Sequence, residues 1–383
     1  MHLGGLAMGL INIRLGDYIE RSTQNNKDLE YGTDLIVGVN SQGIFTVPKG
    51  NTDGVDLKPY KIVNNGAFVY NPTRLELGSI AYRTEGLCIV SHLYMVFYLT
   101  DEGKKIIDPM WLYIYFRRAE FCREVTFRNF GSQRPEFNFN DMSDIIVPLP
   151  DIKIQRKYVD IYNAMLANQQ SYERGLEDLK RVCDAYIENL ANCEYKKIGD
   201  YIERNKNRNQ DNKFTVSDVK GFNNDGLFIE PMRLFSGDIT TFKIVTRNDF
   251  VYNSRINSTI KKLSIVINEG EDLIVSPAYE SFRVCRENEL SPFYLYLLLQ
   301  RESFARKVLF NSFGSSTIVF GYDVLSEIEI PVPAFTEQVA LANIYRAYKE
   351  RWGINEKLKA QIKDICPILI KGSIEEARKT KEA

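Results

Sequence analysis

The sequence has few of the residues from which metal sites and acid–base sites are built. Its 383 residues include two histidines, His2 and His92, and six cysteines that form no C-x-x-C pair and no Cys/His cluster. We therefore expect no metal site and no cofactor, and His92 is better explained as a strand-end residue than as a general base. Scattered cysteines in a chain of this size are typical of reduced, mostly buried thiols in a cytoplasmic protein.

Long apolar runs and an excess of charge of one sign are also absent. The longest apolar stretches, such as residues 93–99, are far shorter than the roughly 18–20 residues that a membrane helix needs, so no membrane partner is expected. Residues 1–10 are small and apolar but carry no Lys or Arg, which makes a poor signal peptide; a tag or a misplaced start is an equal alternative. The 49 Lys+Arg and 50 Asp+Glu give a net charge of −1, which excludes binding to nucleic acid through bulk charge.

The motifs that hold nucleotides or nucleophiles are missing as well. The sequence contains no G-x-x-x-x-G-K-[ST], no G-x-G-x-x-G and no G-x-S-x-G, so neither a phosphate-binding loop nor a nucleophile elbow is predicted. The nearest approach to the N-P-P-[YF] motif of amino-methyltransferases is Asn71-Pro72-Thr73, which lacks the second proline and the aromatic residue. We expect a binding protein that is not an enzyme.

One internal repeat dominates what is present. Gly16-Asp17-Tyr18-Ile19-Glu20-Arg21 recurs unchanged as Gly199-Asp200-Tyr201-Ile202-Glu203-Arg204, at an offset of 183 residues. The same offset, within two residues, relates Phe68-Val69-Tyr70-Asn71 to Phe250-Val251-Tyr252-Asn253 and Phe130-Gly131-Ser132 to Phe313-Gly314-Ser315. A period this long exceeds any solenoid unit, so it predicts a duplicated domain in which each copy has its own core.

The composition of each copy changes at a Pro-x-Pro sequence, which is Pro148-Leu149-Pro150 in the first copy and Pro331-Val332-Pro333 in the second. Before it, short apolar runs at residues 35–39, 67–70 and 87–90 predict strands joined by turns. A helix over residues 109–123, matched by 292–307, interrupts them, with a proline at the first turn of each.

A long helix is predicted after each Pro-x-Pro. Residues 151–193 contain no proline, and apolar residues at alternating spacings of three and four indicate a helix packed along another helix. The seam residues are Tyr162, Met165, Gln169, Tyr172, Leu176, Leu179, Cys183, Tyr186 and Leu190. The second helix, from residue 335 to about 377, has a matching seam at Ile354, Leu358, Ile362, Ile365 and Leu369, and Pro367 is expected to kink it. The predicted fold is α+β, with two duplicated domains of mixed sheets joined by two long helices that form an antiparallel coiled coil.

This organisation resembles the specificity subunit of type I restriction–modification enzymes. The resemblance rests on the two Gly-Asp-Tyr-Ile-Glu openings, the two Phe-Gly-Ser segments, and a short apolar run before each Pro-x-Pro. A glutamine follows each Pro-x-Pro, at Gln155 and at Gln338. The resemblance spans about residues 12–380. It implies target-recognition domains at 12–150 and 196–333, each followed by a conserved helix at 151–195 and 334–380.

The resemblance also implies a function and partners. Each recognition domain would read one half of a bipartite site in double-stranded DNA, and the helices would set the spacing and dock methyltransferase subunits, two in the expected complex. Restriction subunits would join them in the full complex, and the chain itself would be non-catalytic. Because the chain is nearly neutral, the partner subunits would supply much of the grip on the phosphate backbone.

Residues that read base edges must be hydrogen-bonding side chains displayed on loops. The late loops begin at Phe130-Gly131-Ser132 in the first domain and at Phe313-Gly314-Ser315 in the second. Their sequences diverge directly after these residues, as those of two readers of different half-sites would. In the first domain the candidates are Asn71, Arg74, Arg83, Ser132, Gln133 and Arg134. In the second domain they are Asn253, Arg255, Asn257, Lys261, Ser315, Ser316 and Thr317.

Alternatives remain open at this point. A duplicated domain on a coiled coil could be an adaptor that binds only proteins, and a salt-dependent gel shift would separate it from a DNA reader. A fused restriction–methylation enzyme would need its catalytic motifs on another chain. Four arginines cluster in the first domain: Arg117, Arg118, Arg123 and Arg128. We interpret them first as solvent-exposed residues of a helix, and contact with DNA phosphates is the alternative.

Overall fold

The structure is a computed structural model of the whole chain. It describes residues 9–48, 50, 52–129, 136–190, 193–224, 226–231, 237–256, 263–312 and 318–382. The chain forms two compact units, one of Met1–Glu173 with Ile354–Ala383 and the other of Arg174–Gly353. Each unit therefore contains one copy of the repeat, the first part of the long helix that follows it, and a part of the other long helix.

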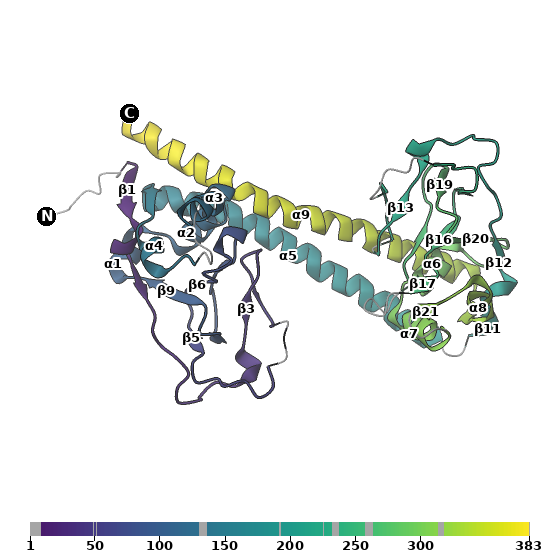
Figure 1. Cartoon of the computed structure of the whole chain (residues 1–383), viewed down its shortest axis with the longest axis horizontal. Helices are drawn as coiled ribbons and strands as arrows, with labels where there is room; N and C mark the ends of the chain where they lie inside the picture. Colours follow the sequence, from purple (N-terminus) through teal and green to yellow (C-terminus); the bar gives the residue numbers. More distant parts are fainter. Residues whose placement is uncertain are drawn as a thin grey trace. The chain divides into compact units, whose positions relative to one another are not determined.

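The first unit is an α+β domain (Figure 1). Its strands are β1 (Ile11–Arg14), β2 (Ile19–Arg21), β3 (Gly38–Val39), β4 (Phe45–Thr46), β5 (Lys61–Val63), β6 (Phe68–Tyr70), β7 (Ile80–Tyr82), β8 (Cys88–Val90), β9 (Met95–Leu99) and β10 (Ile146–Leu149). Its short helices are η1 (Leu15–Asp17), η2 (Thr33–Leu35), η3 (Leu75–Leu77), α1 (Asp101–Ile106), α2 (Pro109–Phe116), α3 (Ala119–Arg128) and α4 (Phe139–Ser143).

The second unit repeats this order, with β17 and β21 added and no described counterpart of η3 or α1. Its strands are β11 (Tyr195–Lys197), β12 (Ile202–Arg204), β13 (Gly221–Phe222), β14 (Phe228–Ile229), β15 (Lys243–Val245), β16 (Phe250–Tyr252), β17 (Arg255–Ile256), β18 (Ile265–Ile267), β19 (Leu273–Val275), β20 (Glu280–Val284), β21 (Ile318–Val319) and β22 (Glu329–Pro331). Its helices are η5 (Ile198–Asp200), η6 (Val216–Asp218), α6 (Pro292–Leu299), α7 (Glu302–Phe310) and α8 (Tyr322–Glu327).

The two units have matching sheets. A four-stranded sheet runs β2-β9-β6-β7 in the first and β12-β20-β16-β18 in the second, and all its ladders are antiparallel. Isolated parallel bridges join Ile36 to Ile89 and Val219 to Ile274. At the centre of each sheet two phenylalanine rings stack across neighbouring strands, Phe68 on Phe97 at 5.0 Å and Phe250 on Phe282 at 4.7 Å. The duplicated domain and the α+β fold predicted from the sequence are confirmed.

Close packing explains why the repeat begins with glycine. A Cβ added to Gly16 would lie 2.7 Å from Ser143 Cβ, and one added to Gly199 would lie 2.9 Å from Ser326 Cβ and from the Ser326 carbonyl oxygen. These distances are below van der Waals contact, so a larger residue at either position would have to move α4 or α8.

The glutamine after each Pro-x-Pro has an equally specific role. Gln155 is fully buried, accepts a hydrogen bond from Asp108 N at 2.8 Å, and donates to the carbonyls of Ile106 and Pro150. Gln338 repeats the arrangement with Ser291 N and the carbonyls of Glu289 and Pro333. Each glutamine thus ties the start of a long helix to the start of the domain's first buried helix.

The predicted helix over residues 109–123 is wrong in its extent. Two helices, α2 and α3, replace it, and α6 and α7 replace its partner over 292–307. The chain turns where Arg118 is extended, at φ −74° and ψ 145°. Since α2 is apolar on all sides and α3 is amphipathic, a straight continuation would carry the charged residues of α3 into the core.

The strand predicted over residues 35–39 is also shorter than expected. Leu35 ends the 3-10 helix η2, and only Gly38–Val39 pair as a strand, with Phe45–Thr46. The strands predicted at 67–70 and 87–90 are confirmed as β6 and β8.

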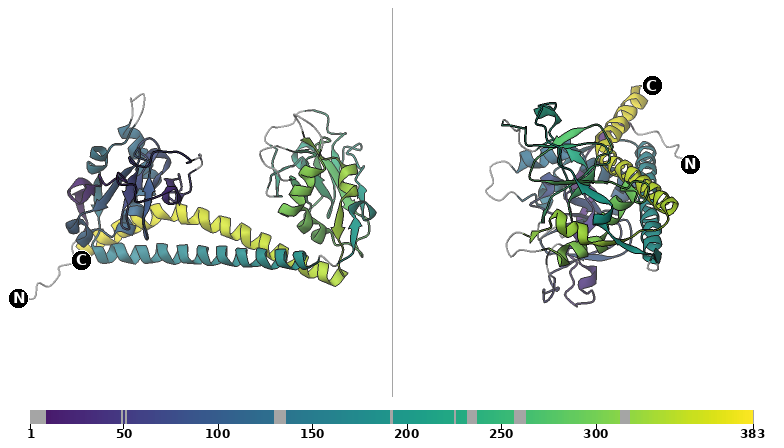
Figure 2. Two further views of the ribbon diagram at one scale, coloured as in Figure 1. Left: turned by 90° about the horizontal axis from the view of Figure 1, so that it is seen from below. Right: turned by 90° about the vertical axis from the view of Figure 1, so that its right-hand side faces the viewer.

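The two long helices are α5 (Ile152–Asn189) and α9 (Phe335–Glu382), and they lie side by side and antiparallel (Figures 1 and 2). Within the first unit, Lys157 Nζ pairs with Glu376 Oε2 at 2.8 Å and Gln169 Nε2 donates to Asn355 Oδ1 at 3.0 Å. The helix α9 continues through Pro367. The predicted antiparallel helix pair is confirmed.

The seam differs from its predicted positions at one point in each helix. Tyr162, Gln169, Leu176 and Cys183 are buried as predicted, but Tyr186 is exposed and the adjacent Ile187 is buried instead. In α9, Ile354 is exposed and Asn355 is buried. Val159, near the start of α5, is buried as well and lies at the same position of the seven-residue repeat as Ile187, so the second row of the seam at these two points follows the predicted row by one residue.

Candidate nucleic-acid interface

A tight turn follows β6 and carries two of the predicted site residues. Asn71 Oδ1 accepts hydrogen bonds from Thr73 N at 3.1 Å and from Thr73 Oγ1 at 2.9 Å. The Asn71 carbonyl accepts from Arg74 N, and Asn71 N donates to the Ser79 carbonyl. Asn71 therefore shapes the turn through its side-chain oxygen. Arg74 caps η3 through its backbone, and its side chain is exposed.

The matched turn in the second unit follows β16. Asn253 Oδ1 accepts from Arg255 N at 3.0 Å, and Asn253 N donates to the Ser264 carbonyl. Arg255 lies in β17 opposite Val319 of β21, and its side chain is exposed. Among the described residues, no hydrogen bond or ion pair engages the guanidinium of Arg74 or of Arg255.

The chain returns to each turn directly after the late loop. Phe137 N donates to the Pro72 carbonyl at 3.0 Å, and Phe320 N donates to the Ser254 carbonyl at 2.8 Å. Both phenylalanine side chains are fully buried. The structure thus anchors the end of each late loop beside the turn that displays Arg74 or Arg255, two regions that are far apart in the sequence.

Six predicted site residues of the late loops and two of the loop after β17 lie outside the described residues. These are Ser132, Gln133, Arg134, Asn257, Lys261, Ser315, Ser316 and Thr317.

Arg83 is in a different environment from Arg74. Its guanidinium lies 5.3 Å from the centre of the Phe45 ring, and its Nη2 donates to the Leu87 carbonyl at 3.3 Å. Its backbone pairs with Gly66 and Ala67. Arg83 is half-buried and holds the turn between β7 and β8, so it is not displayed with the residues of the Asn71 turn.

Arg74 also lines a groove of about 500 Å³ beside the β3–β4 hairpin. Val47 and Leu77, whose side chains are strongly exposed, line the same groove. The groove therefore combines one cationic donor with apolar groups, the combination that can contact a guanine edge and a thymine methyl group.

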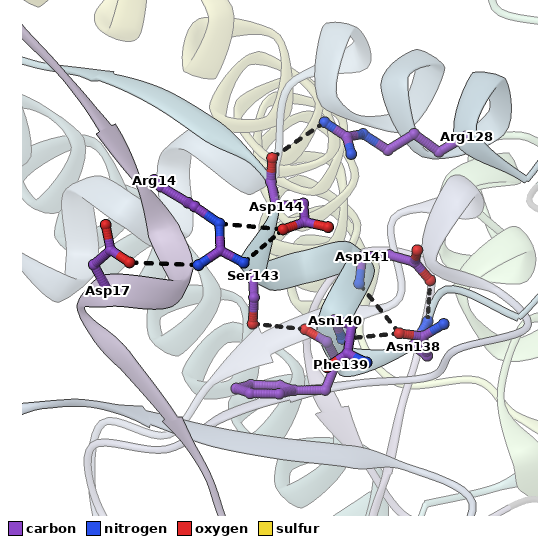
Figure 3. A network of polar contacts seen from close by, with 9 residues as sticks. All are labelled: Arg14, Asp17, Arg128, Asn138, Phe139, Asn140, Asp141, Ser143 and Asp144. Carbon is purple, nitrogen blue, oxygen red and sulfur yellow. Dashed lines mark hydrogen bonds and ion pairs between the residues drawn. The ribbon is translucent and has the colours of Figure 1, made fainter.

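The helix that follows the first late loop is held by a polar network (Figure 3). Asn138 and Asp141 form a capping box, in which Asn138 Oδ1 accepts from Asp141 N at 3.1 Å and Asp141 Oδ2 accepts from Asn138 N at 2.9 Å. Arg14 Nη2 pairs with Asp144 Oδ1 at 2.6 Å, and Arg128 Nη2 donates to the Asp144 carbonyl at 3.4 Å. The network ties α4 to β1 and α3.

The second unit repeats the ion pair but not the capping box. Lys197 Nζ pairs with Glu327 Oε2 at 2.7 Å, at the positions matched to Arg14 and Asp144. Gly321 is the N-cap of α8 and makes no side-chain cap. The sequence analysis did not predict these two ion pairs. A signal for them was present, because the basic residues at 14 and 197 and the acidic residues at 144 and 327 are each separated by the repeat offset of 183.

The four clustered arginines are engaged in contacts within the chain. Arg117 donates to the carbonyls of Gly78 and Ser41, and Arg118 donates to the Tyr115 carbonyl and stacks over its ring at 3.8 Å. The remaining two form ion pairs along α3: Arg123 with Glu120 and Arg128 with Glu124. These contacts favour the interpretation as helix surface over phosphate contact.

Two matched lysines are also used internally. Lys61 Nζ donates to the Tyr94 carbonyl and Lys243 Nζ to the Tyr279 carbonyl. Burial lowers the pKa of both ammonium groups. Each lysine closes the turn that precedes the last strand of its four-stranded sheet, and neither is presented on the surface of the turns described above.

In the described part of the chain, no three His, Cys, Asp or Glu side chains are grouped so that they could hold a metal ion. Over the same residues, none of the helices has the length and apolarity that crossing a membrane requires. All six cysteines are free.

The chain is thus built from two copies of one α+β domain, each followed by a long helix. The family model described as "Type I restriction modification DNA specificity domain" matches the chain twice, over residues 10–181 and 185–364. The chain belongs to this family and carries two of its domains, which confirms the resemblance seen in the sequence. No curated protein matches the sequence.

A solved structure shows the same fold. The S subunit of a type I restriction–modification system from M. genitalium aligns over 97% of this chain and 98% of its own, with 11% identity and a TM-score of 0.59. The HsdS subunit from Thermoanaerobacter tengcongensis aligns over 96% of each chain, with 14% identity and a TM-score of 0.38.

Proposed function

We propose that the chain is the DNA-binding specificity subunit of a type I restriction–modification complex. Each target-recognition domain, over residues 12–150 and 196–333, reads one half of a bipartite site. The helices over residues 151–195 and 334–380 set the spacing of the halves and dock methyltransferase subunits. The chain is non-catalytic, and methylation and cleavage belong to its partner subunits.

The observation that carries the proposal is the display of one exposed arginine just after the Asn71 turn in the first domain and one just after the Asn253 turn in the second, at positions one residue apart in the repeat. Arg74 caps η3 and Arg255 lies in β17, each just after a turn that an asparagine side chain builds. The chain that returns from the late loop is hydrogen-bonded to each turn, at Pro72 or at Ser254. Because no described residue engages either guanidinium, each is available for a bidentate contact to guanine in the major groove. Because Asn71 and Asn253 use their side-chain oxygens to build the turns, we assign them a positioning role.

The family membership supports the division of labour. Two copies of one specificity domain in a single chain provide two readers, and their late loops differ where their scaffolds agree. In this proposal the helix pair sets the separation of the two readers, as a bipartite DNA site requires.

The test is to coexpress the chain with its methyltransferase subunit and to sequence the methylated sites of the host DNA. A bipartite methylated motif is expected. Arg74→Ala should cost about 1–3 kcal/mol at one position of the first half-site and leave the second half-site unchanged, and Arg255→Ala should do the reverse. Arg286→Ala, which removes an exposed arginine that lies 3.9 Å from Glu289, is the control and should leave the motif unchanged.

Several outcomes would contradict the proposal. Methylation without a sequence motif, or a motif indifferent to both Arg74→Ala and Arg255→Ala, would remove these turns as readers. Complete absence of salt-dependent DNA binding by the assembled complex would favour a protein adaptor instead.

A further inference from the structure

Two phenylalanines are exposed at matched positions in the two domains. Phe127 is 82% exposed near the end of α3, and Phe310 is 89% exposed at the end of α7. They are related by the repeat offset of 183 residues, in the shared sequence Phe-x-x-Phe-Gly-Ser. After these two, the most exposed aromatic side chain among the described residues is Tyr195, at 46%.

Neither phenylalanine belongs to the apolar stripe of its helix. The buried residues of α3 are Phe121 and Val125, and those of α7 are Phe304 and Val308. Phe127 and Phe310 each follow the second buried residue by two positions, which turns them by about 200° to the opposite face. The domain core therefore has no use for these rings, and yet both copies keep them.

The charges around Phe127 do not suit a polyanion. The residues that share its helix face include Glu120, Arg123 and Glu124, and here the arginine is paired with Glu120 at 3.3 Å. Arg128 is paired with Glu124. In the second unit Lys307 is committed to the Glu329 carbonyl at 2.9 Å, while Arg306, four residues before Phe310, is exposed. Around Phe127 a phosphate backbone would meet carboxylates and engaged cations, whereas an apolar protein pocket with a polar rim is complementary to that face.

The duplication indicates what kind of partner fits. The late loops, which differ between the domains, are suited to two different half-sites, but the phenylalanines are identical and so suit two identical partners. We infer that Phe127 and Phe310 are equivalent docking anchors, each of which inserts into an apolar pocket of one methyltransferase subunit. This inference rests on the proposed function, and it adds the α3 and α7 faces to the long helices as part of the docking surface.

The experiment compares Phe127→Ala, Phe310→Ala and the double variant with wild type. Leu93→Ala is the matched control, because Leu93 is 66% exposed and the corresponding residue of the second domain is Ala278. Binding of the purified methyltransferase subunit is measured by calorimetry, and the composition of the complex by native mass spectrometry. Since all three side chains are largely exposed, thermal unfolding should be unchanged in every variant.

Each single phenylalanine variant should weaken one of the two binding events by roughly 10–100-fold, as expected for an aromatic anchor, and the double variant should weaken both. The control should bind as wild type does. Wild-type affinity in the double variant would overturn the inference. So would normal assembly combined with weaker binding of the DNA site, which would assign the rings to DNA. A wild-type chain that does not bind the methyltransferase subunit would overturn the inference and the proposed function together. If the phenylalanine variants lose docking as expected but the wild-type complex methylates no bipartite motif, the proposed function alone is overturned.

Discussion

The side-chain amide of Gln169 donates a hydrogen bond to Asn355 Oδ1 at 3.0 Å, inside the seam between α5 and α9. Both residues are buried. Gln169 Nε2 also donates to Glu173, whose other oxygen accepts from Lys359 Nζ at 2.9 Å. These hydrogen bonds lower the pKa of Glu173. The apolar seam is thus interrupted by a connected polar layer, which is stable only while its members remain paired.

We expect this layer to show strong coupling in a double-mutant cycle. Gln169→Leu or Asn355→Leu alone should reduce the free energy of unfolding by about 1–3 kcal/mol, because each leaves a buried polar partner unsatisfied. The double variant should lie within about 1 kcal/mol of wild type, because neither polar group then remains. Urea unfolding followed by helical circular dichroism measures both. Additive losses in the double variant would show that the two side chains do not depend on each other.

Two glycines of α9 should respond in opposite ways to the same substitution. A Cβ added at Gly353 would have no neighbour within 4 Å, whereas one added at Gly372 would lie 2.8 Å from Tyr158 Cε1. Gly353→Ala should therefore stabilise the protein by about 0.5–1 kcal/mol through helix propensity. Gly372→Ala should destabilise it by about 1–3 kcal/mol, because the Tyr158 ring must move.

Thermal unfolding of the two glycine variants tests this difference, and Tyr158→Ala supplies its control. In the Tyr158→Ala background the ring is gone, so Gly372→Ala should no longer be destabilising. A destabilising effect that persists there would mean that the close approach to Tyr158 is not the reason for glycine at this position.

Asp249 should make the second unit more stable, relative to a neutral variant, as the pH falls. Its carboxylate accepts from Thr246 N at 2.8 Å and Asn205 Nδ2 at 3.0 Å and faces Arg283 Nε at 3.3 Å, but burial still raises its pKa above the ordinary value. A carboxyl group with a raised pKa binds a proton more readily in the folded chain. Its contribution to the free energy of unfolding therefore grows as the pH falls through the raised pKa, and is complete below the unfolded value of about 3.9.

The measurement compares urea unfolding of wild type and Asp249→Asn between pH 7 and pH 4. The stability of wild type relative to the variant should increase towards pH 4. Asp211→Asn, which removes an exposed carboxylate, controls for the loss of one negative charge. A difference that stays constant or reverses sign would contradict the assigned direction of the pKa.

The repeat made the architecture predictable, because matched residues such as Gln155 and Gln338 make the same contacts in both copies. Local pattern could not reveal the turn at Arg118, since the apolar spacing of α2 and the amphipathic spacing of α3 read as one continuous helix. It also could not distinguish Arg74, which is displayed, from Arg83, which packs on Phe45. Both are arginines near predicted turns, and only long-range contacts separate them.

The late loops should be exchangeable between the domains if the replaced segment ends at the right residue. Asn138 caps α4 through its side chain, while its counterpart Gly321 makes no side-chain cap. The exchange should therefore replace residues 133–137 by 316–320 and retain Asn138. Both segments end in a buried phenylalanine whose N–H bonds the preceding turn, at Pro72 or Ser254, so the new segment can be anchored as the old one is.

The exchanged chain, expressed with its methyltransferase subunit, should methylate a motif altered in the first half-site and unchanged in the second. Asn138→Gly alone is the matched control: it should cost a few tenths of a kcal/mol, because glycine is itself tolerated as an N-cap, and leave the motif unchanged. If Arg134 contacts guanine, Arg134→Ala should relax one position of the first half-site at a cost of about 1–3 kcal/mol. If it contacts phosphate, binding should weaken for every sequence alike and the salt slope should fall by about one. An exchanged loop that alters only the second half-site would reverse the assignment of domains to halves, and an unaltered motif would exclude residues 133–137 from base recognition.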